Sequence, residues 1–224
     1  MRDSVRLLPP LQSTVVSVTH AILPPSATVE RVAQAFAEEK RLAEILTAND
    51  WLMSVLTVVR GVDALDSAVS AGVIRNVVWD YLHGHSEPTP VRDVDIPFFD
   101  PEDLSLELEH SVGEDLQRRM PDVLWDARNQ ARVHLWYEDR FGHPILPIKS
   151  LEDAVARHPE TATSVAVRLR NDDSLEVIAP CGLHDLLNMV VRHNPRQVSH
   201  DHSLRRLYDK RIQQTWPKVT VAPD

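Results

Sequence analysis

Residues 66–100, DSAVSAGVIRNVVWDYLHGHSEPTPVRDVDIPFFD, contain the pattern that decides the fold. The short apolar stretch at 67–71 predicts a buried strand, and Gly72 follows it directly. Helical spacing of apolar residues then continues to Gly84, a residue type that commonly ends helices. After a proline-containing loop, residues 93–100 alternate between polar and apolar side chains, as a strand does. The order is therefore strand, glycine, helix, loop and strand.

Apolar spacing also predicts the elements on both sides of this unit. Helices are expected at 29–48, 51–62, 102–120, 182–193 and 202–216, and strands at 129–139 and in a hairpin of 165–170 with 175–179. These elements predict an α+β fold, with a small mixed β-sheet flanked by helices and an N-terminal helical extension. Residues 1–65 are expected to form an N-terminal arm and helices that pack on the core. Residues 66–224 are expected to form the main domain with its C-terminal helices.

Composition narrows the class of protein. The 224 residues carry a formal net charge of −9, which disfavours a broad electrostatic surface for nucleic acid. The single cysteine, Cys181, excludes an intramolecular disulfide and fits a reducing compartment. The sequence shows no signal-peptide pattern and no window of roughly 18 uninterrupted apolar residues. We therefore expect a cytoplasmic protein with no membrane partner.

Gly72 and the helix after it are typical of a phosphate-binding site. A glycine lets the backbone turn sharply and lets a phosphate approach without a Cβ in the way. The helix start offers unpaired N–H groups and the positive end of the helix dipole. Arg75 and Asn76, in the first turn, can add charged and neutral donors to a phosphate or ribose. We therefore expect Gly72, Arg75 and Asn76 to bind a nucleotide.

Asp93 and Asp95 are two residues apart on the second expected strand, which predicts that both side chains point to the same face. Two carboxylates there can hold one or two Mg²⁺ or Mn²⁺ ions. Such ions neutralise phosphate charge, activate an attacking hydroxyl and offset the repulsion between the carboxylates. An isolated Asp-x-Asp is a weak signal, but its place after the glycine and the helix strengthens it.

The segments AGVIRNVVWDYLHG and RDVDIPFFD resemble the glycine motif and the Asp-x-Asp motif of the polymerase-β-like nucleotidyltransferase superfamily. The chain looks particularly like a family of small bacterial nucleotidyltransferase-like proteins, because NQARVHLW, PETATSVAVRL and LEVIAPCGLHDLL also match that family. The resemblance extends over about 66–216. It implies transfer of a nucleotidyl group from an NTP, with Asp93 and Asp95 as metal ligands and Gly72 at the phosphate. The tRNA nucleotidyltransferases have a similar glycine-rich helix start, but they usually carry an acidic residue at the position of Asn76.

The superfamily commonly supplies a third carboxylate from a neighbouring strand, as the base that helps deprotonate the acceptor. The strand expected to provide it here is 129–139. The polar face of this strand offers Gln130, Arg132 and His134, and no acid occurs before Glu138.

Two residues are left open as the missing base. His134 has an ordinary pKa near neutrality, and Glu176 lies on the expected strand 175–179. Asn129 and Arg132, beside His134, are expected to contact the nucleotide. The catalytic set predicted from sequence is therefore Asp93, Asp95, His134 and Glu176.

Three functions fit this pattern. The first is Mg²⁺-dependent transfer of a nucleoside monophosphate from an NTP to an acceptor, which the acidic composition predicts to be a small molecule or a protein more than a long nucleic acid. The second is a non-catalytic NTP-sensing or interaction module with the same fold. The third is a metal-dependent phosphohydrolase that uses water as the nucleophile. The sequence leaves the nucleobase, the acceptor and the oligomeric state open.

Overall fold

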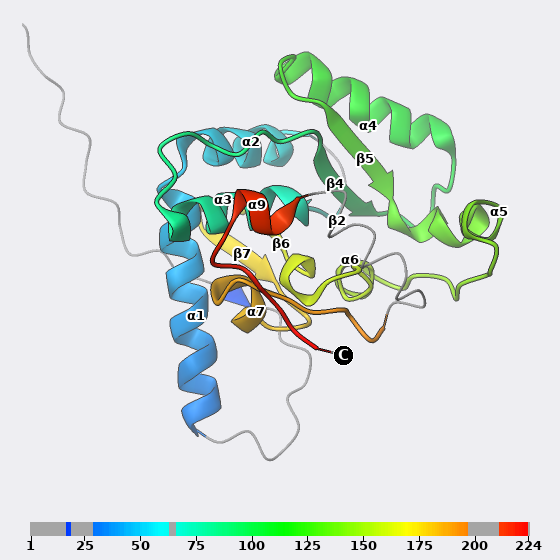
Figure 1. Cartoon of the computed structure of the whole chain (residues 1–224). Coiled ribbons are helices and arrows are strands. Elements are labelled where there is room, and N and C mark those ends of the chain that lie inside the picture. Colours follow the sequence, from blue (N-terminus) through cyan, green and yellow to red (C-terminus); the bar gives the residue numbers. More distant parts are fainter. Residues whose placement is uncertain (1–16, 19–28, 63–65, 197–210, 224) are drawn as a thin grey trace, which may run out of the picture.

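The computed structural model describes residues 17–18, 29–62, 66–196 and 211–223 (Figure 1). The helices are α1 (Val29–Thr47), α2 (Asp50–Arg60), α3 (Gly72–His83), α4 (Leu106–Arg119), α5 (Tyr137–Phe141), α6 (Leu151–Val155), α7 (His184–Leu187) and α9 (Ile212–Thr215), with 3-10 helices η1 (Gln130–Leu135) and η2 (Thr161–Thr163). The strands are β1 (Ser17–Val18), β2 (Asp66–Ser67), β3 (Val69–Ser70), β4 (Val94–Phe99), β5 (Trp125–Asn129), β6 (Ala166–Leu169), β7 (Leu175–Ile178), β8 (Val190–Val191) and β9 (Thr220–Val221).

The described strands form small sheets with helices around them, which confirms the predicted α+β class. One sheet has the order β1-β7-β6-β3, a second has the order β2-β4-β5, and β8 pairs with β9. The stretch expected as one strand at 67–71 is divided between the first two sheets, with Ala68 between β2 and β3. The chain therefore passes from one sheet to the other immediately before α3 begins.

A common hydrophobic core holds α1, α2 and α3 against the sheets. Leu42 and Leu46 of α1, Leu52 and Leu56 of α2, and Trp79 of α3 are all at most 1% exposed and belong to one cluster of contacting side chains. Burial of this much apolar surface is the main force that packs the helices on the sheets.

The C-terminal segment is anchored to α3 through its tryptophan. The Trp79 and Trp216 rings meet edge to face with their centroids 5.3 Å apart, and the Trp216 indole N–H donates to Asp80 at 2.7 Å. Figure 1 shows α9 lying beside α3. Most of the helix expected at 202–216 lies outside the described residues.

Several local features follow from the sequence, and those at Gly84 and in the hairpin confirm predictions. Gly84 ends α3 in the left-handed conformation, with φ of 69°. Asn49 caps α2 by accepting a hydrogen bond from the backbone N–H of Leu52 at 2.8 Å. The hairpin is present as β6 and β7, which pair in antiparallel register from Ala166 opposite Ile178 to Leu169 opposite Leu175.

The strand expected at 129–139 is wrong. The strand β5 ends at Asn129, and residues 130–135 form the 3-10 helix η1. The reason is the Asn129 side chain, which accepts a hydrogen bond from the backbone N–H of Ala131 at 3.1 Å and so turns the chain out of the sheet.

Two helix boundaries also differ from expectation. The helix expected from 102 begins at Leu106, after Ser105 caps it, because Asp100 and Asp103 use their carboxylates to hold turns. The helix expected at 182–193 is limited to α7 and is followed by strand β8.

No single helix in the described part of the chain is long and apolar enough to cross a membrane. The helices α1 and α2 meet the length and composition criteria only together, and they are bent by 96° at their junction.

Candidate active site

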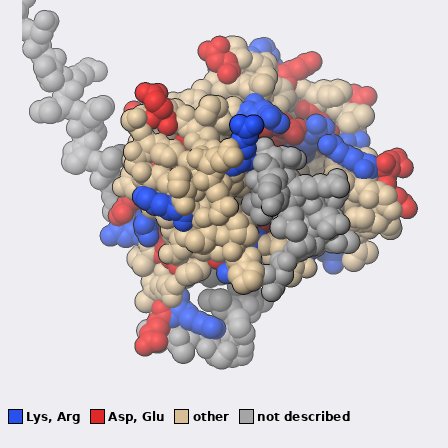
Figure 2. Space-filling view, viewed as in Figure 1, with Lys and Arg blue, Asp and Glu red and all other residues tan. Residues whose placement is uncertain are grey.

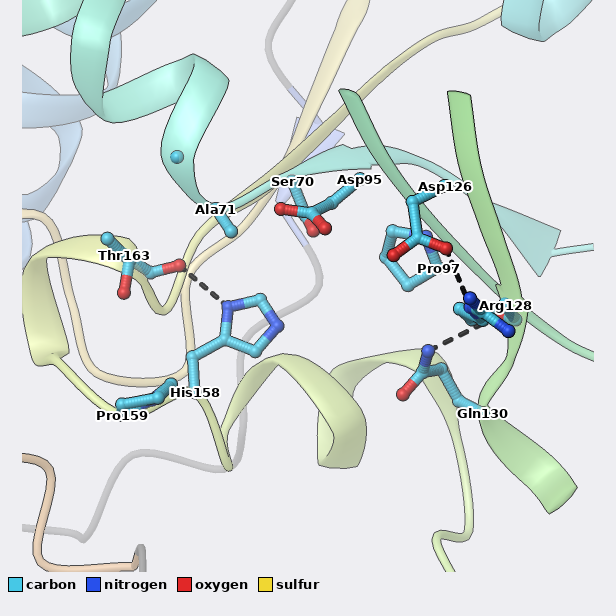
Figure 3. A pocket seen from close by; sticks show the side chains of 11 residues that line it. Ser70, Ala71, Asp95, Pro97, Asp126, Arg128, Gln130, His158, Pro159 and Thr163 are labelled. Atoms are coloured by element: carbon cyan, nitrogen blue, oxygen red, sulfur yellow. Dashed lines mark hydrogen bonds and ion pairs between the residues drawn. The ribbon is translucent and has the colours of Figure 1, made fainter. Parts of the chain in front are cut away.

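A hollow of about 190 Å³ lies where the end of β3, the start of α3 and the strands β4 and β5 come together (Figure 3). We call it the carboxylate hollow. Its lining residues are Ser70, Ala71, Gly72, Asp95, Pro97, Asp126, Arg128, Gln130, His158, Pro159 and Thr163. The set combines two acids, a backbone turn at a helix start and a histidine, and it comes from segments distant in the sequence.

Asp95 and Asp126 form the acidic side of the carboxylate hollow. The strands β4 and β5 are parallel, and Asp95 is the register partner of Asp126. Neighbouring strands are about 4.8 Å apart, so the two carboxylates start from adjacent backbone positions on the same face of the sheet. Figure 3 shows both carboxylates at the hollow.

Arg128 compensates part of this negative charge. Its Nε donates to Asp126 at 2.6 Å, and its guanidinium lies 3.7 Å from the buried carboxylate of Glu109. The side chain of Gln130 donates to the Arg128 carbonyl at 3.2 Å. One guanidinium is therefore shared between Asp126 and Glu109.

The strained backbone at the helix start lies at Ala71, before the predicted glycine. Ala71 has φ of 58° and ψ of −119°, a conformation that residues with a side chain rarely adopt. Gly72 has no positive φ, and a Cβ on it would meet no atom of the described protein within 4 Å. The fold itself therefore does not require glycine at 72, whereas a ligand that approaches the backbone would.

The start of α3 offers donors to the carboxylate hollow. No side chain caps this helix end, so its first N–H groups are available to an anion. Ser70 is 1% exposed and lines the hollow, and within the described residues its hydroxyl makes no hydrogen bond. A phosphate oxygen would satisfy both the helix start and this hydroxyl.

His158 lies across the carboxylate hollow from Asp126 (Figure 3). Its Nδ1 is 2.8 Å from the Thr163 carbonyl oxygen. Because a carbonyl only accepts, Nδ1 carries the proton in this contact. In the neutral ring the other nitrogen, Nε2, is then the hydrogen-bond acceptor.

Asp93 does not lie in the carboxylate hollow. It precedes β4, is exposed, and lines a separate hollow formed by α3 and the loop after it. Arg75 and Asn76 are buried, and Arg75 Nη2 donates to the Asn76 side-chain oxygen at 2.7 Å. The Arg75 guanidinium is stacked over the rings of Trp79 and Trp216, at 5.3 and 5.1 Å from their centroids.

Asn129 and Arg132 make structural contacts. The Asn129 side chain is fully buried and bonds to four backbone groups, those of Asp100, Ala131 and Asp103. Arg132 donates to the Leu104 carbonyl at 3.0 Å and lies 3.3 Å from Glu109. Neither residue lines the carboxylate hollow.

His134 and Glu176 also lie outside the lining of the carboxylate hollow. His134 is part of η1. Glu176 is 1% exposed on β7 and pairs with Arg168 and Arg170, the latter at 2.6 Å. The hydrogen bond to Glu176, opposed in part by burial, raises the pKa of the Arg168 guanidinium.

The reasoning from sequence missed Asp126, although a signal was present. In VLWDAR, the apolar residues Val123, Trp125 and Ala127 alternate with Leu124, Asp126 and Arg128. This alternation predicts a strand at 123–128, whereas the alternation in NQARVHLW led to a strand expected at 129–139. With the strand expected too late in the sequence, Asp126 was not placed on it.

The donor chemistry of this pair fits a divalent cation. Carboxylate oxygens suit Mg²⁺ and Mn²⁺, and Mg²⁺ is commonly held by one or two carboxylates together with substrate phosphates. No group of three or more His, Cys, Asp or Glu side chains among the described residues is placed to hold a metal ion. Asp95 and Asp126 would therefore hold such an ion jointly with a bound phosphate.

A family model described as nucleotidyltransferase matches residues 57–221. The chain belongs to this family. The resemblance to the polymerase-β-like nucleotidyltransferase superfamily is thereby confirmed. No curated protein matches the nucleotidyltransferase.

A solved structure with a similar fold supports this assignment, and two further structures show weaker similarity. A structure described as revealing a CCA-adding enzyme head domain shares 29% identity with the nucleotidyltransferase, with a TM-score of 0.67, over 81% of this chain and 96% of that one. A Thermotoga maritima CCA-adding enzyme complexed with tRNA is 16% identical with a TM-score of 0.49, over 81% of this chain and 42% of the enzyme. A CCA-adding enzyme with ATP is 18% identical with a TM-score of 0.41, over 86% of this chain and 42% of that one. The nucleotidyltransferase thus spans less than half the length of these two enzymes.

Proposed function

We propose that this nucleotidyltransferase transfers a nucleoside monophosphate from an NTP to an acceptor hydroxyl, with Mg²⁺ or Mn²⁺ held by Asp95 and Asp126. The observation that carries the proposal is the register pairing of these two acids beside the start of α3. The proposed reaction forms a bond between the acceptor oxygen and the α-phosphorus. The bond from the α-phosphorus to the bridging oxygen breaks, and pyrophosphate leaves.

The helix start and Ser70 are proposed to hold the phosphates. Gly72 leaves space for close approach of a phosphate oxygen, and the first N–H groups of α3 donate to it. His158 lies on the same side as the helix start and Thr163, so in its protonated form it contacts the leaving pyrophosphate through Nε2. These groups orient the triphosphate and stabilise negative charge on it.

Asp126 is proposed to accept the proton of the attacking hydroxyl, the role for which a third carboxylate was expected. The hydrogen bond from Arg128 Nε holds the Asp126 carboxylate in position. A divalent ion, when bound, neutralises phosphate charge and lowers the pKa of the attacking hydroxyl. Metal binding by Asp93 stays a prediction of the family resemblance.

Asp126 supports catalysis over the non-catalytic alternative, because it is an acid on the strand next to β4, the kind of position from which the missing base was expected. The nature of the acceptor is not decided by the family. Figure 2 shows basic and acidic side chains interspersed over one face of the molecule. The formal net charge of −9 supports a small acceptor more than a long nucleic acid.

The test is NTP binding by calorimetry with and without Mg²⁺, combined with release of pyrophosphate. We expect Asp95→Asn and Asp126→Asn each to weaken Mg²⁺-dependent binding and to slow transfer about 100-fold or more, since metal neutralisation contributes several kcal/mol. Asp139→Asn, at an exposed position of α5, is the matched control. Equal Mg²⁺-dependent binding in all four proteins would refute the proposal.

A further inference from the structure

Strand β5 lies at the edge of its sheet. In the order β2-β4-β5 its neighbour is β4, and no other described strand pairs with its outer side. A hollow of about 340 Å³ lies between residues 125–128 of β5 and the side of α4 from Glu109 to Gln117, and we call it the edge hollow. Asp126 and Arg128 line both the edge hollow and the carboxylate hollow. The edge of β5 therefore borders the candidate active site.

The hydrogen bonds between β4 and β5 determine which main-chain groups face this edge. The Val94 N–H donates to the Leu124 carbonyl at 2.8 Å, and Val94 is the register partner of Trp125. In a parallel pair, alternate residues of one strand direct both the N–H and the C=O to the same neighbour. Asp126 therefore bonds toward β4, whereas Trp125 and Ala127 direct their main-chain groups to the outer side.

The next outward residue follows the same alternation. The Asn129 N–H points to the outer side and donates to the Glu109 carboxylate at 2.8 Å. For the main-chain groups of Trp125 and Ala127, the described residues offer no such partner. Both residues line the edge hollow, so these groups are open to a ligand. Outward N–H and C=O groups on alternate residues are the pattern with which an extended polypeptide segment pairs.

The direction of attack places the acceptor on the β5 side. Figure 3 shows Ala71, Asp95 and Asp126 following one another across the carboxylate hollow. The proposed site of the phosphates and of the leaving pyrophosphate is the start of α3, on the Ala71 side. In an in-line displacement the attacking and leaving oxygens lie on opposite sides of the phosphorus. The acceptor hydroxyl then enters beside Asp126, where β5 has its open edge.

A strand added to this edge would extend the row formed by Asp95 and Asp126. These two residues are register partners, and neighbouring strands are about 4.8 Å apart. A side chain opposite Asp126 on the added strand points to the same face, with its Cβ about 5 Å from that of Asp126. The hydroxyl of a serine or threonine is bonded directly to Cβ. It therefore lies within hydrogen-bond reach of the carboxylate that accepts its proton.

The other face of the added strand would meet α4. The Ala127 side chain packs with Val112 of α4 in the common core, so alternate side chains of the segment point to the edge hollow. Gly113 lines this hollow, and a Cβ on it would meet no described atom within 4 Å. Glu114 is exposed there and forms no ion pair with the described residues. The edge hollow thus has space and negative charge for a lysine or arginine next to the hydroxyl residue.

We propose that the acceptor is a serine or threonine hydroxyl in an extended polypeptide segment that pairs with β5, with a basic residue beside it in the edge hollow. The hydroxyl oxygen forms the bond to the α-phosphorus, its proton passes to Asp126, and the bond to the bridging oxygen breaks with loss of pyrophosphate. The acceptor role rests on the proposed nucleotidyl transfer, whereas pairing of the segment with β5 does not. The formal net charge of −9, which disfavours long nucleic acid, attracts a basic segment of this kind.

The first test measures binding of the peptide acetyl-Val-Lys-Ser-Lys-Val-amide to ¹⁵N-labelled full-length protein by NMR. We expect the backbone amide resonances of Trp125 and Ala127 to shift. The same peptide with glutamates in place of the lysines should bind about fivefold more weakly. Shifts that exclude both residues, equal binding of the two peptides, or no binding would overturn the proposal. Shifts of these amides on dilution of the protein alone would assign the edge to a second copy of the chain, and would also overturn it.

Main-chain pairing is tested on the peptide, so that the protein stays unchanged. One probe carries an N-methyl group on the serine nitrogen, and the other carries it on the nitrogen of the lysine that follows. Successive N–H groups of a strand face opposite edges. We therefore expect one probe to lose about tenfold in affinity, as for one hydrogen bond, and the other to retain its affinity. Loss in both probes, or in neither, would contradict strand addition.

Two glutamates of α4 separate the edge hollow from the rest of the helix. We expect Glu114→Gln to weaken binding of the lysine peptide about threefold, while Glu107→Gln, at an exposed position outside the lining, leaves it unchanged. Equal affinity in the two variants would contradict the basic neighbour. Mg²⁺-dependent NTP binding should stay intact in both, which distinguishes failure of this inference from failure of the transferase assignment.

The acceptor role is tested by transfer of label from α-labelled NTP to the peptide. We expect label on the serine peptide and none on a peptide with alanine in place of serine. A serine peptide that shifts Trp125 and Ala127 but receives no label, in a protein that binds Mg²⁺ and NTP, would refute the acceptor role.

Discussion

Asp95 on β4 and Asp126 on β5 are direct register partners across a parallel strand pair, and both line the carboxylate hollow. Two ionised carboxylates at neighbouring positions repel each other unless a cation lies between or beside them. Arg128 donates to Asp126 at 2.6 Å. The proposed binding of a divalent ion with the nucleotide rests on this pair of carboxylates.

Gly72→Ala should separate nucleotide binding from stability. The added Cβ meets no described protein atom within 4 Å but enters the space at the start of α3. We expect the NTP dissociation constant to rise at least tenfold in calorimetry, with the free energy of unfolding changed by less than about 1 kcal/mol. Gly113→Ala is the control, since it is also a helical glycine with open space around it and lies on α4. An unchanged dissociation constant in Gly72→Ala would contradict close approach of phosphate at this residue.

Two substitutions, His158→Asn and His158→Gln, test the two ring nitrogens of His158 separately. Asn at position 158 retains a donor near the Thr163 carbonyl but lacks any group at Nε2, whereas Gln places its amide near Nε2. If Nε2 contacts the pyrophosphate, His158→Asn should weaken NTP binding about tenfold or more, as for a lost hydrogen bond to a charged group. His158→Gln should retain more of the affinity. Similar affinity in His158→Asn and the wild type, measured by calorimetry, would exclude the contact.

Asn129→Ala should lower the stability of the folded protein and leave nucleotide binding intact. The side chain bonds to four backbone groups at a fully buried position, and its loss leaves buried donors and acceptors of Asp100 and Ala131 without partners. We expect about 3 kcal/mol of destabilisation in urea unfolding, with NTP affinity retained at temperatures where the variant is folded. Asn188→Ala, at an exposed position, should change stability by less than about 0.5 kcal/mol. A large loss of affinity with normal stability would instead support the nucleotide contact predicted from sequence.

Glu176→Gln tests whether this buried acid is structural or catalytic. Its carboxylate is bonded to Arg168 and Arg170, and Arg168 also bonds to Asp66. Removing the negative charge should destabilise the protein by about 2 kcal/mol, because the half-buried Arg168 and the exposed Arg170 lose a charged hydrogen-bond partner. Pyrophosphate release measured below the unfolding temperature should stay within twofold of the wild type, as in the exposed control Glu107→Gln. A loss of about 100-fold with unchanged stability would make Glu176 the base predicted from sequence.

Local signals in the sequence predicted much of the fold. Gly84 ends α3, Asn49 caps α2, and the turn at 171–174 joins β6 to β7, because each depends on side chains only a few residues away. The family motif around Gly72 and Asp95 is likewise contiguous, so a single sequence was sufficient to identify it.

The composition of the site was decided by tertiary structure. Asp126 became the partner of Asp95 only through the parallel pairing of β4 with β5, and a connection through α4 separates these strands. The end of β5 depends on the buried bonds of Asn129 to Asp100 and Asp103, which no local pattern displays. By itself, the sequence determined the family and one acid of the pair. Long-range strand pairing and burial decided the second acid and the histidine that faces it, because register and buried hydrogen bonds are set by distant partners.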